Sequence, residues 1–357
     1  MGSPDIRAAR GTVGIEDHQV PKRVLIVTIS EDVHADLVAS RIASEGQPAF
    51  RLDLDDFPAG YEVGFGFAGG RWGGELRNVE SGEALRLRDV GAVWMRKRAS
   101  YRYLSDGLGA HEKAHADAET DHMLLGLLRS LDCRWMSHPD AVRGSHWKPE
   151  QLRRAARMGF AVPASLMTNV RAEVDRFSAT AEHGIVFKVL SSMLDAAVAV
   201  GPEEELARGV PTTLIGPEHE EMLDSVAELP CFFQHYVPKR HELRVTVIGE
   251  SVYAARIHSQ DDPRTTTDWR DMSAEIRYES ETLAPEVERR CLDFVHSYGL
   301  TFGAIDLVVT PSGEHVFLEN NPVGQFLFVE QLVPELDMTG AVARWLVDAA
   351  GSRREAE

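Results

Sequence analysis

Two carboxylates and a carboxamide are brought together by a predicted hairpin near the C-terminus. Strand-like runs flank the dipeptide Ser312-Gly313, which is typical of a tight turn between antiparallel strands. Counting back from a turn centred between these two residues places Asp306 opposite Glu319. Asn321 follows two residues later, on the same face of the strand.

This arrangement of oxygen-bearing side chains predicts a metal site. Two carboxylates that face each other directly repel, and a hard cation removes the repulsion. Carboxylate and amide oxygens are the ligands that suit Mg²⁺, which also shares substrate phosphates. Val308 and Phe317 are expected on the same face, so the face should be covered. The alternatives are a register that is off by one residue, or acids that are simply solvated.

Cationic side chains occupy unusual places upstream of this hairpin. Lys188 lies inside an apolar, strand-like run, where a lysine is rare without an anionic partner. Lys148 opens a predicted helix, where the helix dipole disfavours a positive charge. Glu242 and Arg244 share a face of another predicted hairpin, over residues 241–255. Together with the metal residues, these side chains indicate a site for a polyphosphate with Mg²⁺.

The elements that must position these residues divide at a break in the chain. Residues 1–22 are polar and aperiodic, which predicts a disordered segment. Residues 23–54 have the pattern of a β-α-β unit, which begins an α/β domain. Short alternating runs separated by glycines over residues 61–98 predict antiparallel strands, and residues 109–131 predict a long helix. The break at residues 137–139 is the first predicted domain boundary.

The remainder of the chain predicts mixed, largely antiparallel sheets with helices, which is an α+β arrangement. A helix over residues 148–158 and two hairpins are its clearest elements. We therefore divide the chain into an N-terminal α/β domain (23–137) and two α+β subdomains (138–236 and 237–351).

Composition narrows the classes of partner. The chain has 357 residues with 38 Lys and Arg against 56 Asp and Glu, a formal net charge of −18. Such a chain repels nucleic-acid phosphates and anionic lipids, so we expect neither as a partner. No apolar run is long enough to span a membrane or to form a signal peptide. Three widely spaced cysteines favour a cytoplasmic protein without disulfides.

Two short motifs have a simpler explanation than their usual function. Gly64, Gly66 and Gly69 fit the dinucleotide-binding pattern, but a glycine-rich hairpin explains them better. His111 and His115 fit the HExxH pattern of zinc enzymes. Charged neighbours favour a solvated helix face there, and a zinc hydrolase remains an alternative.

From Lys148 to Asn321, the sequence resembles the ATP-grasp carboxylate–amine or carboxylate–alcohol ligases. The resemblance implies the α+β ATP-grasp fold, in which two subdomains clasp ATP, preceded by an α/β pre-ATP-grasp domain. It also implies roles for individual residues: Lys148 and Lys188 for the ATP phosphates, Gln234 and Tyr236 in an adenine-binding hinge that uses its backbone, Glu242 for the ribose, Arg244 for the transferring phosphoryl group, and Asp306, Glu319 and Asn321 for Mg²⁺.

Within these ligases, the chain is most similar to the microviridin-type, or graspetide, branch that matures ribosomal peptides. The motifs that carry this resemblance lie at residues 92–98, 232–237, 258–260 and 267–270. It implies that Asp or Glu side chains of a precursor peptide, made of leader and core, are activated as acyl phosphates. Ser or Thr hydroxyls, or Lys amines, would then attack, while Arg244 and Arg270 neutralise charge. The loop after Lys188 lacks the glycines of many ATP-grasp lids.

Several points stay open at this level. A ligase for a free amino acid or dipeptide, a glutamate-tailing ligase similar to RimK, and a non-catalytic ATP-binding regulator are the alternative functions. The acidic segment 198–226, in which Arg208 is the one Lys or Arg, is a candidate docking surface for a basic leader. A homodimer is compatible with the sequence, which does not indicate whether esters or amides form.

Overall fold

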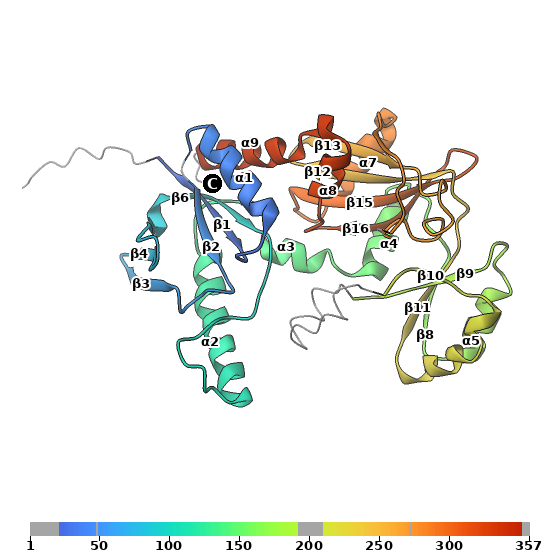
Figure 1. Ribbon diagram of the computed structural model, residues 1–357, viewed down its shortest axis with the longest axis horizontal. Helices are drawn as coiled ribbons and strands as arrows, with labels where there is room; N and C mark the ends of the chain where they lie inside the picture. The colour runs from blue at the N-terminus through green and yellow to red at the C-terminus, as the bar shows by residue number, and fades with distance from the viewer. Residues whose placement is uncertain (1–20, 48, 192–209, 272, 352–357) are drawn as a thin grey trace, which may run out of the picture.

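The computed structural model describes residues 21–47, 49–191, 210–271 and 273–351 (Figure 1). The predicted disordered segment 1–22 lies outside the described residues, apart from Pro21 and Lys22. The same is true of the strand expected at 198–200. In Figure 1, an N-terminal part lies to the left, and two further layers lie above and below one another to the right.

The N-terminal part is built on a four-stranded parallel sheet in the order β2-β1-β6-β7. The predicted β-α-β unit is confirmed as β1 (Arg23–Thr28), α1 (Val33–Ser44) and β2 (Ala49–Asp53). The expectation that residues 92–95 pair antiparallel is wrong, because β6 (Val90–Met95) runs parallel to both β1 and β7 (Arg134–Met136). Its interior residues are buried, as in the central strand of a parallel sheet that is covered on both faces.

A small antiparallel sheet accounts for the glycine-rich region. It consists of β3 (Tyr61–Ala68), β4 (Arg71–Asn78) and β5 (Ala84–Arg86), followed by the short helix η1 (Leu87–Asp89). Gly69 and Gly70 form the β3–β4 turn with φ values of +60° and +80°, which glycine adopts without strain. The hairpin expected from Gly64, Gly66 and Gly69 is confirmed.

Helix α2 (Ala110–Arg129) carries the HExxH residues on an exposed face, as predicted. His111 and His115 are both exposed. The Glu112 carboxylate accepts a hydrogen bond from the Gly109 N–H and so caps the helix. Within the described part of the chain, no cluster of three or more His, Cys, Asp and Glu side chains could hold a metal ion.

The central part is an antiparallel sheet in the order β10-β9-β11-β8. The helix expected near residues 218–226 is instead two 3₁₀ segments, η3 and η4. Leu223 and Val226 are the buried residues of η4, and their three-residue spacing suits the three-residue turn of a 3₁₀-helix. The bounds are α3 (Pro139–Gly144), α4 (Lys148–Arg157), β8 (Ser165–Thr168), α5 (Arg171–Ser178), β9 (Ile185–Lys188), β10 (Thr213–Leu214), η3 (Pro217–His219), η4 (Met222–Glu228) and β11 (Cys231–His235).

The C-terminal part is a five-stranded antiparallel sheet in the order β14-β13-β12-β15-β16. Helix α7 covers one face of this sheet, where Phe294, Leu243 and Phe317 belong to one buried core. The opposite face carries Glu242 and Asp306. The bounds are β12 (His241–Ile248), β13 (Ser251–Ile257), β14 (Tyr278–Ser280), α7 (Pro285–His296), β15 (Phe302–Val309), β16 (His315–Asn321), α8 (Leu327–Leu332), η5 (Pro334–Leu336) and α9 (Met338–Gly351).

The last helix packs against the N-terminal part of the chain. Helix α9 lies beside α1 in Figure 1, and both contribute to one hydrophobic core with Val24, Phe302 and Phe326. The N-terminal and C-terminal parts therefore share a core. The three-part division of the chain remains a prediction, and α9 connects its first and third parts.

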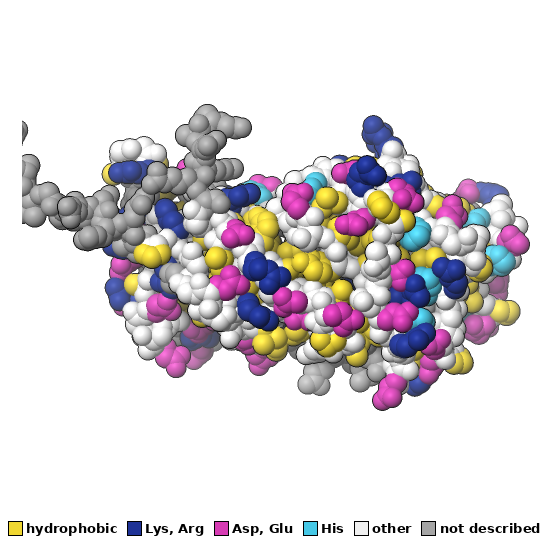
Figure 2. Space-filling view, turned by 90° about the horizontal axis from the view of Figure 1, so that it is seen from above, with side chains coloured by type: hydrophobic (Ala, Val, Ile, Leu, Met, Phe, Trp, Pro, Cys, Tyr) yellow, Lys and Arg dark blue, Asp and Glu magenta, His cyan; other side chains and the backbone are white. Residues whose placement is uncertain are grey.

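The surface and the cysteines add two observations. On the face shown in Figure 2, acidic and basic side chains are interspersed. Cys133, Cys231 and Cys291 form no disulfide. Every helix in the described ranges is too short or too polar to cross a lipid bilayer.

Candidate active site

The pairing of Asp306 with Glu319 is confirmed, although the hairpin differs from the predicted one in two places. The loop is Pro311–Gly313, with Gly313 at φ +88°, so its centre lies half a residue before the predicted position. A register shift follows Asp306, so Leu307 pairs with Phe317 and Val308 with Val316. Leu318 is the extra residue, and this bulge restores the predicted pairing at Glu319.

The bulge decides which side chains face the cleft. The expectation that Val308 and Phe317 share a face is wrong, because Phe317 packs in the core beside Leu307. Leu318 takes its place and lines the cleft with Val308, Asp306 and Glu319. The face is covered, as expected, but by a different residue.

Each of the two opposed carboxylates has a cationic partner. The Arg244 Nη1 donates to both carboxylate oxygens of Asp306, at 2.9 and 3.0 Å. The Lys148 Nζ donates to the Glu319 carboxylate. Repulsion between the acids is therefore partly offset by residues that the sequence analysis had assigned to ATP.

The pKa values of the two carboxyl groups shift in opposite directions. Burial raises the pKa of Asp306, and the Glu319 charge adds to this effect while Arg244 opposes it. Burial also disfavours the charge on Glu319, but Lys148 and Lys188 outweigh it and lower the pKa of Glu319 to about 2. The carboxylates of Asp306 and Glu319 both line the same cleft, and Glu319 is ionised at neutral pH.

Lys188 is the cation whose environment best suits a bound anion. It ends β9 and lines the cleft opposite Asp306 and Glu319. Among the described residues, no carboxylate lies within ion-pair distance of its ammonium group. Burial lowers the pKa of Lys188; the charge of Glu319 opposes this effect, and Lys148 and Arg270 add to it. A polyphosphate would supply the missing counter-charge.

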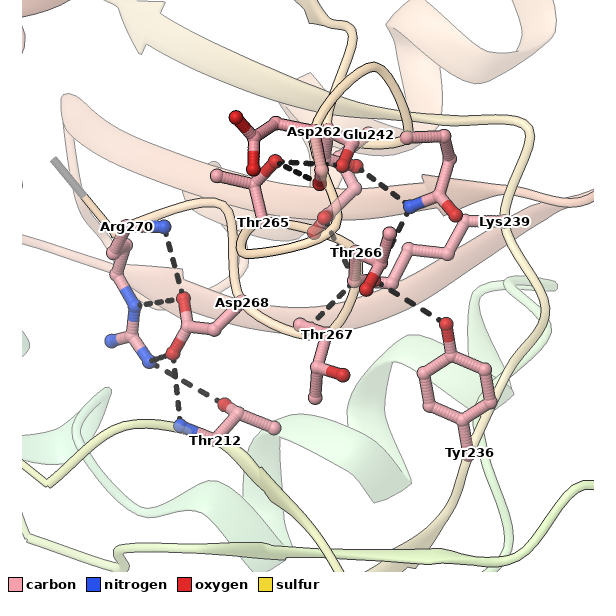
Figure 3. Close-up of polar contacts among 12 residues, drawn as sticks. Thr212, Tyr236, Lys239, Glu242, Asp262, Thr265, Thr266, Thr267, Asp268 and Arg270 are labelled. Carbon is pink, nitrogen blue, oxygen red and sulfur yellow. Dashed lines mark hydrogen bonds and ion pairs between the residues drawn. The ribbon is translucent and has the colours of Figure 1, made fainter. Parts of the chain in front are cut away.

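The segment between β13 and β14 closes one side of the cleft (Figure 3). The Asp268 carboxylate accepts hydrogen bonds from Arg270 at 2.6 and 2.8 Å and from the Thr212 N–H at 2.9 Å. This carboxylate therefore links the C-terminal part to the central part. The hydrogen bond and charge of Asp268 raise the pKa of Arg270, so its guanidinium stays charged.

Glu242 lies deeper, next to a lysine that the sequence analysis missed. The Lys239 Nζ donates to Glu242 Oε1 and to the Thr267 carbonyl, both at 2.8 Å (Figure 3). Burial raises the pKa of Glu242, and Lys239 opposes this. Lys239 precedes β12, and residues three apart do not share a face of a strand, so strand alternation gave no signal for this pair.

The predicted hinge leads out of β11 into this cleft. The Gln234 side chain is buried and donates to the Ser165 hydroxyl at 3.0 Å, and its backbone pairs with Ser165 and Val186. The Tyr236 N–H is bound to the Gly184 carbonyl at 2.9 Å. Backbone contacts to an adenine would therefore come from the Tyr236 carbonyl or from Val237, which also lines the cleft.

Most of the predicted site residues meet in one cleft of about 580 Å³. Lys148 and Arg244 reach it through their ion pairs with Glu319 and Asp306. Asn321 is exposed, pairs with Ala304 in the ladder, and its Oδ1 accepts from the Val323 N–H at 3.3 Å. The predicted residues that line the cleft directly are Lys188, Gln234, Tyr236, Glu242, Arg270, Asp306 and Glu319.

Comparisons with known proteins show which family the whole chain resembles. The model of the MvdD pre-ATP-grasp domain family matches residues 23–143. Among solved structures, the macrocyclase MdnC of Microcystis aeruginosa MRC, bound with the precursor peptide MdnA, is 30% identical, with a TM-score of 0.77 over 91% of this chain and 99% of MdnC. Among curated proteins, no sequence matches this chain.

Two further structures extend the similarity. A RiPP-associated ATP-grasp ligase of Chryseobacterium gregarium, in complex with ADP and a leader and core peptide, is 28% identical, with a TM-score of 0.80 over 92% of this chain and 97% of the ligase. The macrocyclase MdnB of Microcystis aeruginosa MRC is 27% identical, with a TM-score of 0.73 over 92% of this chain and 99% of MdnB. Because both the N-terminal domain and the whole-chain fold match, this chain belongs to the family of ATP-grasp ligases that act as RiPP macrocyclases.

Proposed function

We propose that this protein uses ATP to activate Asp or Glu side chains of a ribosomally made precursor peptide and joins them to Ser or Thr hydroxyls or Lys amines. The observation that carries this proposal is the cleft in which the opposed Asp306 and Glu319 face Lys188, which forms no ion pair with a carboxylate of the described residues. Similarity to MdnC, whose structure holds a precursor peptide, supports a peptide substrate.

ATP fits the cleft by charge and by position. Lys188 lines the cleft and Lys148 reaches its edge through the ion pair with Glu319, so both ammonium groups are placed where they would hold the phosphates. Glu242 is placed for ribose hydroxyls, and the strand end at Tyr236 is placed for adenine. The ligase of Chryseobacterium gregarium, which is in complex with ADP, supports this assignment.

Magnesium fits the donor set of the hairpin. Asp306, Glu319 and Asn321 offer carboxylate and amide oxygens on one face of β15 and β16, which is the chemistry that Mg²⁺ prefers. When bound, Mg²⁺ would neutralise the phosphate charge. Lys148 and Arg244, which pair with Glu319 and Asp306, would lie beside the substrate phosphates.

The chemistry addresses the weak reactivity of a carboxylate. Transfer of the γ-phosphoryl group from ATP to the substrate carboxylate gives an acyl phosphate and ADP, and phosphate is then displaced by the hydroxyl or amine. Arg244 and Arg270 would stabilise the negative charge that develops on the transferring group. The chain itself provides positioning and charge, without a protein nucleophile.

The test is reconstitution with the peptide encoded by a short reading frame next to the gene, rich in Thr and in Asp or Glu. With ATP and Mg²⁺, we expect the peptide to lose one water per crosslink by mass spectrometry, and hydroxylamine to trap the acyl phosphate as a hydroxamate. Fragmentation of the product distinguishes esters from amides. ATP consumption driven by free glutamate or a dipeptide, with no change in the peptide, would instead support the amino-acid ligase alternative.

We further propose that the precursor leader docks on the acidic segment 198–226. Residues 198–209 lie outside the described residues. In the described part, Glu218, Glu220 and Asp224 are exposed, and Arg171 pairs with the latter two. A leader with basic side chains would be attracted by the remaining negative charge.

A further inference from the structure

A buried carboxamide imitates a strand partner next to the proposed metal residues. The Gln151 side chain donates through Nε2 to the Asn320 carbonyl at 2.9 Å and accepts through Oε1 from the Asn320 N–H at 2.8 Å. Nε2 also donates to the Ser145 carbonyl at 2.6 Å. Gln151 and Asn320 are each 3% exposed, and Ser145 is fully buried. The carboxamide therefore satisfies both backbone groups of one residue in a dry environment.

Asn320 lies in β16 between two residues of the proposed metal site. Asn320 separates Glu319 from Asn321, so its backbone fixes where both neighbouring side chains begin. Strand β16 is the edge of its sheet, and its outward-facing groups need partners from elsewhere. The Ala161 carbonyl binds the Phe317 N–H at 2.8 Å, and Gln151 binds Asn320. The two contacts flank the bulge at Leu318, which sets the register of Glu319.

The helix that carries Gln151 also carries Lys148, one turn earlier on the same face. Lys148 contacts the Glu319 carboxylate while Gln151 contacts the next residue. Helix α4 thus holds the strand at two consecutive positions. Burying a peptide group without a hydrogen-bond partner is unfavourable, so without Gln151 the end of β16 would shift to find other partners.

We propose that Gln151 is a positioning residue for the metal site: its carboxamide fixes the Asn320 backbone and so directs Glu319 and Asn321 toward Asp306. The inference rests on the proposed function, because it assumes that these three residues hold a divalent cation. Gln151 itself touches neither the cation nor the substrate.

The test measures Mn²⁺ binding, which is read by electron paramagnetic resonance of the free ion in the presence of ADP. In Gln151→Leu and Gln151→Glu, we expect the dissociation constant for Mn²⁺ to rise about 10- to 100-fold, as for other residues that orient metal ligands. Affinity for ADP without metal should change little. Arg153→Met, an exposed change two residues along the same helix, is the matched control and should keep wild-type Mn²⁺ affinity.

The pH dependence of Gln151→Glu tests whether the hydrogen bonds made by residue 151 control the affinity for Mn²⁺. An ionised carboxylate can accept from the Asn320 N–H but repels the carbonyls of Asn320 and Ser145, whereas a protonated carboxyl can donate to one of them. The difference in Mn²⁺ affinity between this variant and wild type should therefore shrink as pH falls from 8 to 6. Wild-type Mn²⁺ affinity in both variants would show that Gln151 only stabilises the fold. Wild-type protein that binds ADP but no Mn²⁺ would overturn the metal site itself, and the role of Gln151 with it.

Discussion

At the scale of single residues, the cleft is organised by pairs of opposite charge. Asp306 is held by Arg244, Glu319 by Lys148, and Glu242 by Lys239. Such buried pairs cost desolvation, and breaking one leaves a buried charge without a partner. Lys188 lines the same cleft, and no carboxylate of the described chain reaches it. The cleft is therefore prepared for an additional anion.

We expect Glu319→Gln and Asp306→Asn to lower turnover by more than about 100-fold, because each removes a charged oxygen from the proposed metal site. The fold should persist, since an amide keeps the shape of the side chain. Turnover is measured as ADP release with peptide at saturating Mg²⁺, and folding by circular dichroism. Full Mg²⁺-dependent turnover in Glu319→Gln would contradict the site assignment.

His241 gives a pH dependence of stability. Burial, together with Arg256 and Arg240, lowers the pKa of this histidine to about 4 in the folded protein, against 6.5 in the unfolded chain. Between these two values the unfolded chain binds one more proton, so stability falls as pH drops from about 6.5 toward 4. When the pH drops from 7 to 5.5, we expect the unfolding free energy of His241→Gln to fall by about 1 kcal/mol less than that of wild type.

This expectation is checked by urea unfolding at the two pH values. His115→Gln, which changes an exposed histidine of α2, is the control and should retain the wild-type difference. An equal difference in wild type and His241→Gln would show that His241 is not responsible.

At the scale of elements, the loop that follows β16 is held by hydrogen bonds from distant parts of the chain. The Arg244 Nη2 donates to the Gln325 carbonyl at 3.2 Å, and the Arg96 Nη1 donates to the Val323 carbonyl at 3.1 Å. His34 Nε2 accepts from the Phe326 N–H at 3.4 Å. Residues from the first and third parts of the chain therefore hold one short loop.

Gly324 is needed in this loop because its surroundings leave no space for a side chain. A Cβ there would lie 2.6 Å from the Ala304 Cβ and 2.8 Å from the Arg244 Nη2. We expect Gly324→Ala to cost about 1–3 kcal/mol of unfolding free energy and to lower turnover by displacing Arg244. Urea unfolding and ADP release measure the two effects.

The matched control is Gly126→Ala on an exposed face of α2, where nothing lies within 4 Å of the added carbon. This change should leave turnover intact and stabilise the helix by about 0.5–1 kcal/mol. Equal behaviour of the two alanine variants would show that the loop can move aside freely.

At the scale of the whole molecule, the cleft is formed by parts that are distant in sequence. Strands β9 and β11 form one wall, β15 and β16 form another, and the segment around Asp268 spans between them. The shared core around α1 and α9 ties the N-terminal domain to the C-terminal sheet (Figure 1). The chain carries this cleft with a net charge of −18, which should influence how a charged peptide approaches.

Reversal of Glu203, Glu204 and Glu205 to Lys should weaken the binding of a basic leader peptide, and the effect should shrink as salt increases. Calorimetry at low and moderate salt measures the affinity. Reversal of the exposed Glu62, Glu182 and Glu250 makes the same change in net charge elsewhere and should have little effect. Equal affinities of wild type and the first variant at both salts would remove this segment from the docking surface.

The sequence by itself determined the local features of this protein. Alternation and turn chemistry predicted the hairpin that opposes Asp306 and Glu319, the β-α-β start and the glycine-rich hairpin, because these depend on neighbours in the chain. The hairpin itself, together with the motifs that precede it in the chain, indicated the ligase family, which the comparisons confirmed.

Only the tertiary structure decided the features that depend on distant partners. The bulge at Leu318, the clamp formed by Gln151 and the parallel pairing of β6 each require contacts between segments that are far apart in sequence. A residue-by-residue pattern contains the hydrogen-bonding capacity of a carboxamide but not the strand edge that it will meet. Packing of α9 across two parts of the chain is decided in the same way, because an apolar helix face is compatible with any complementary core.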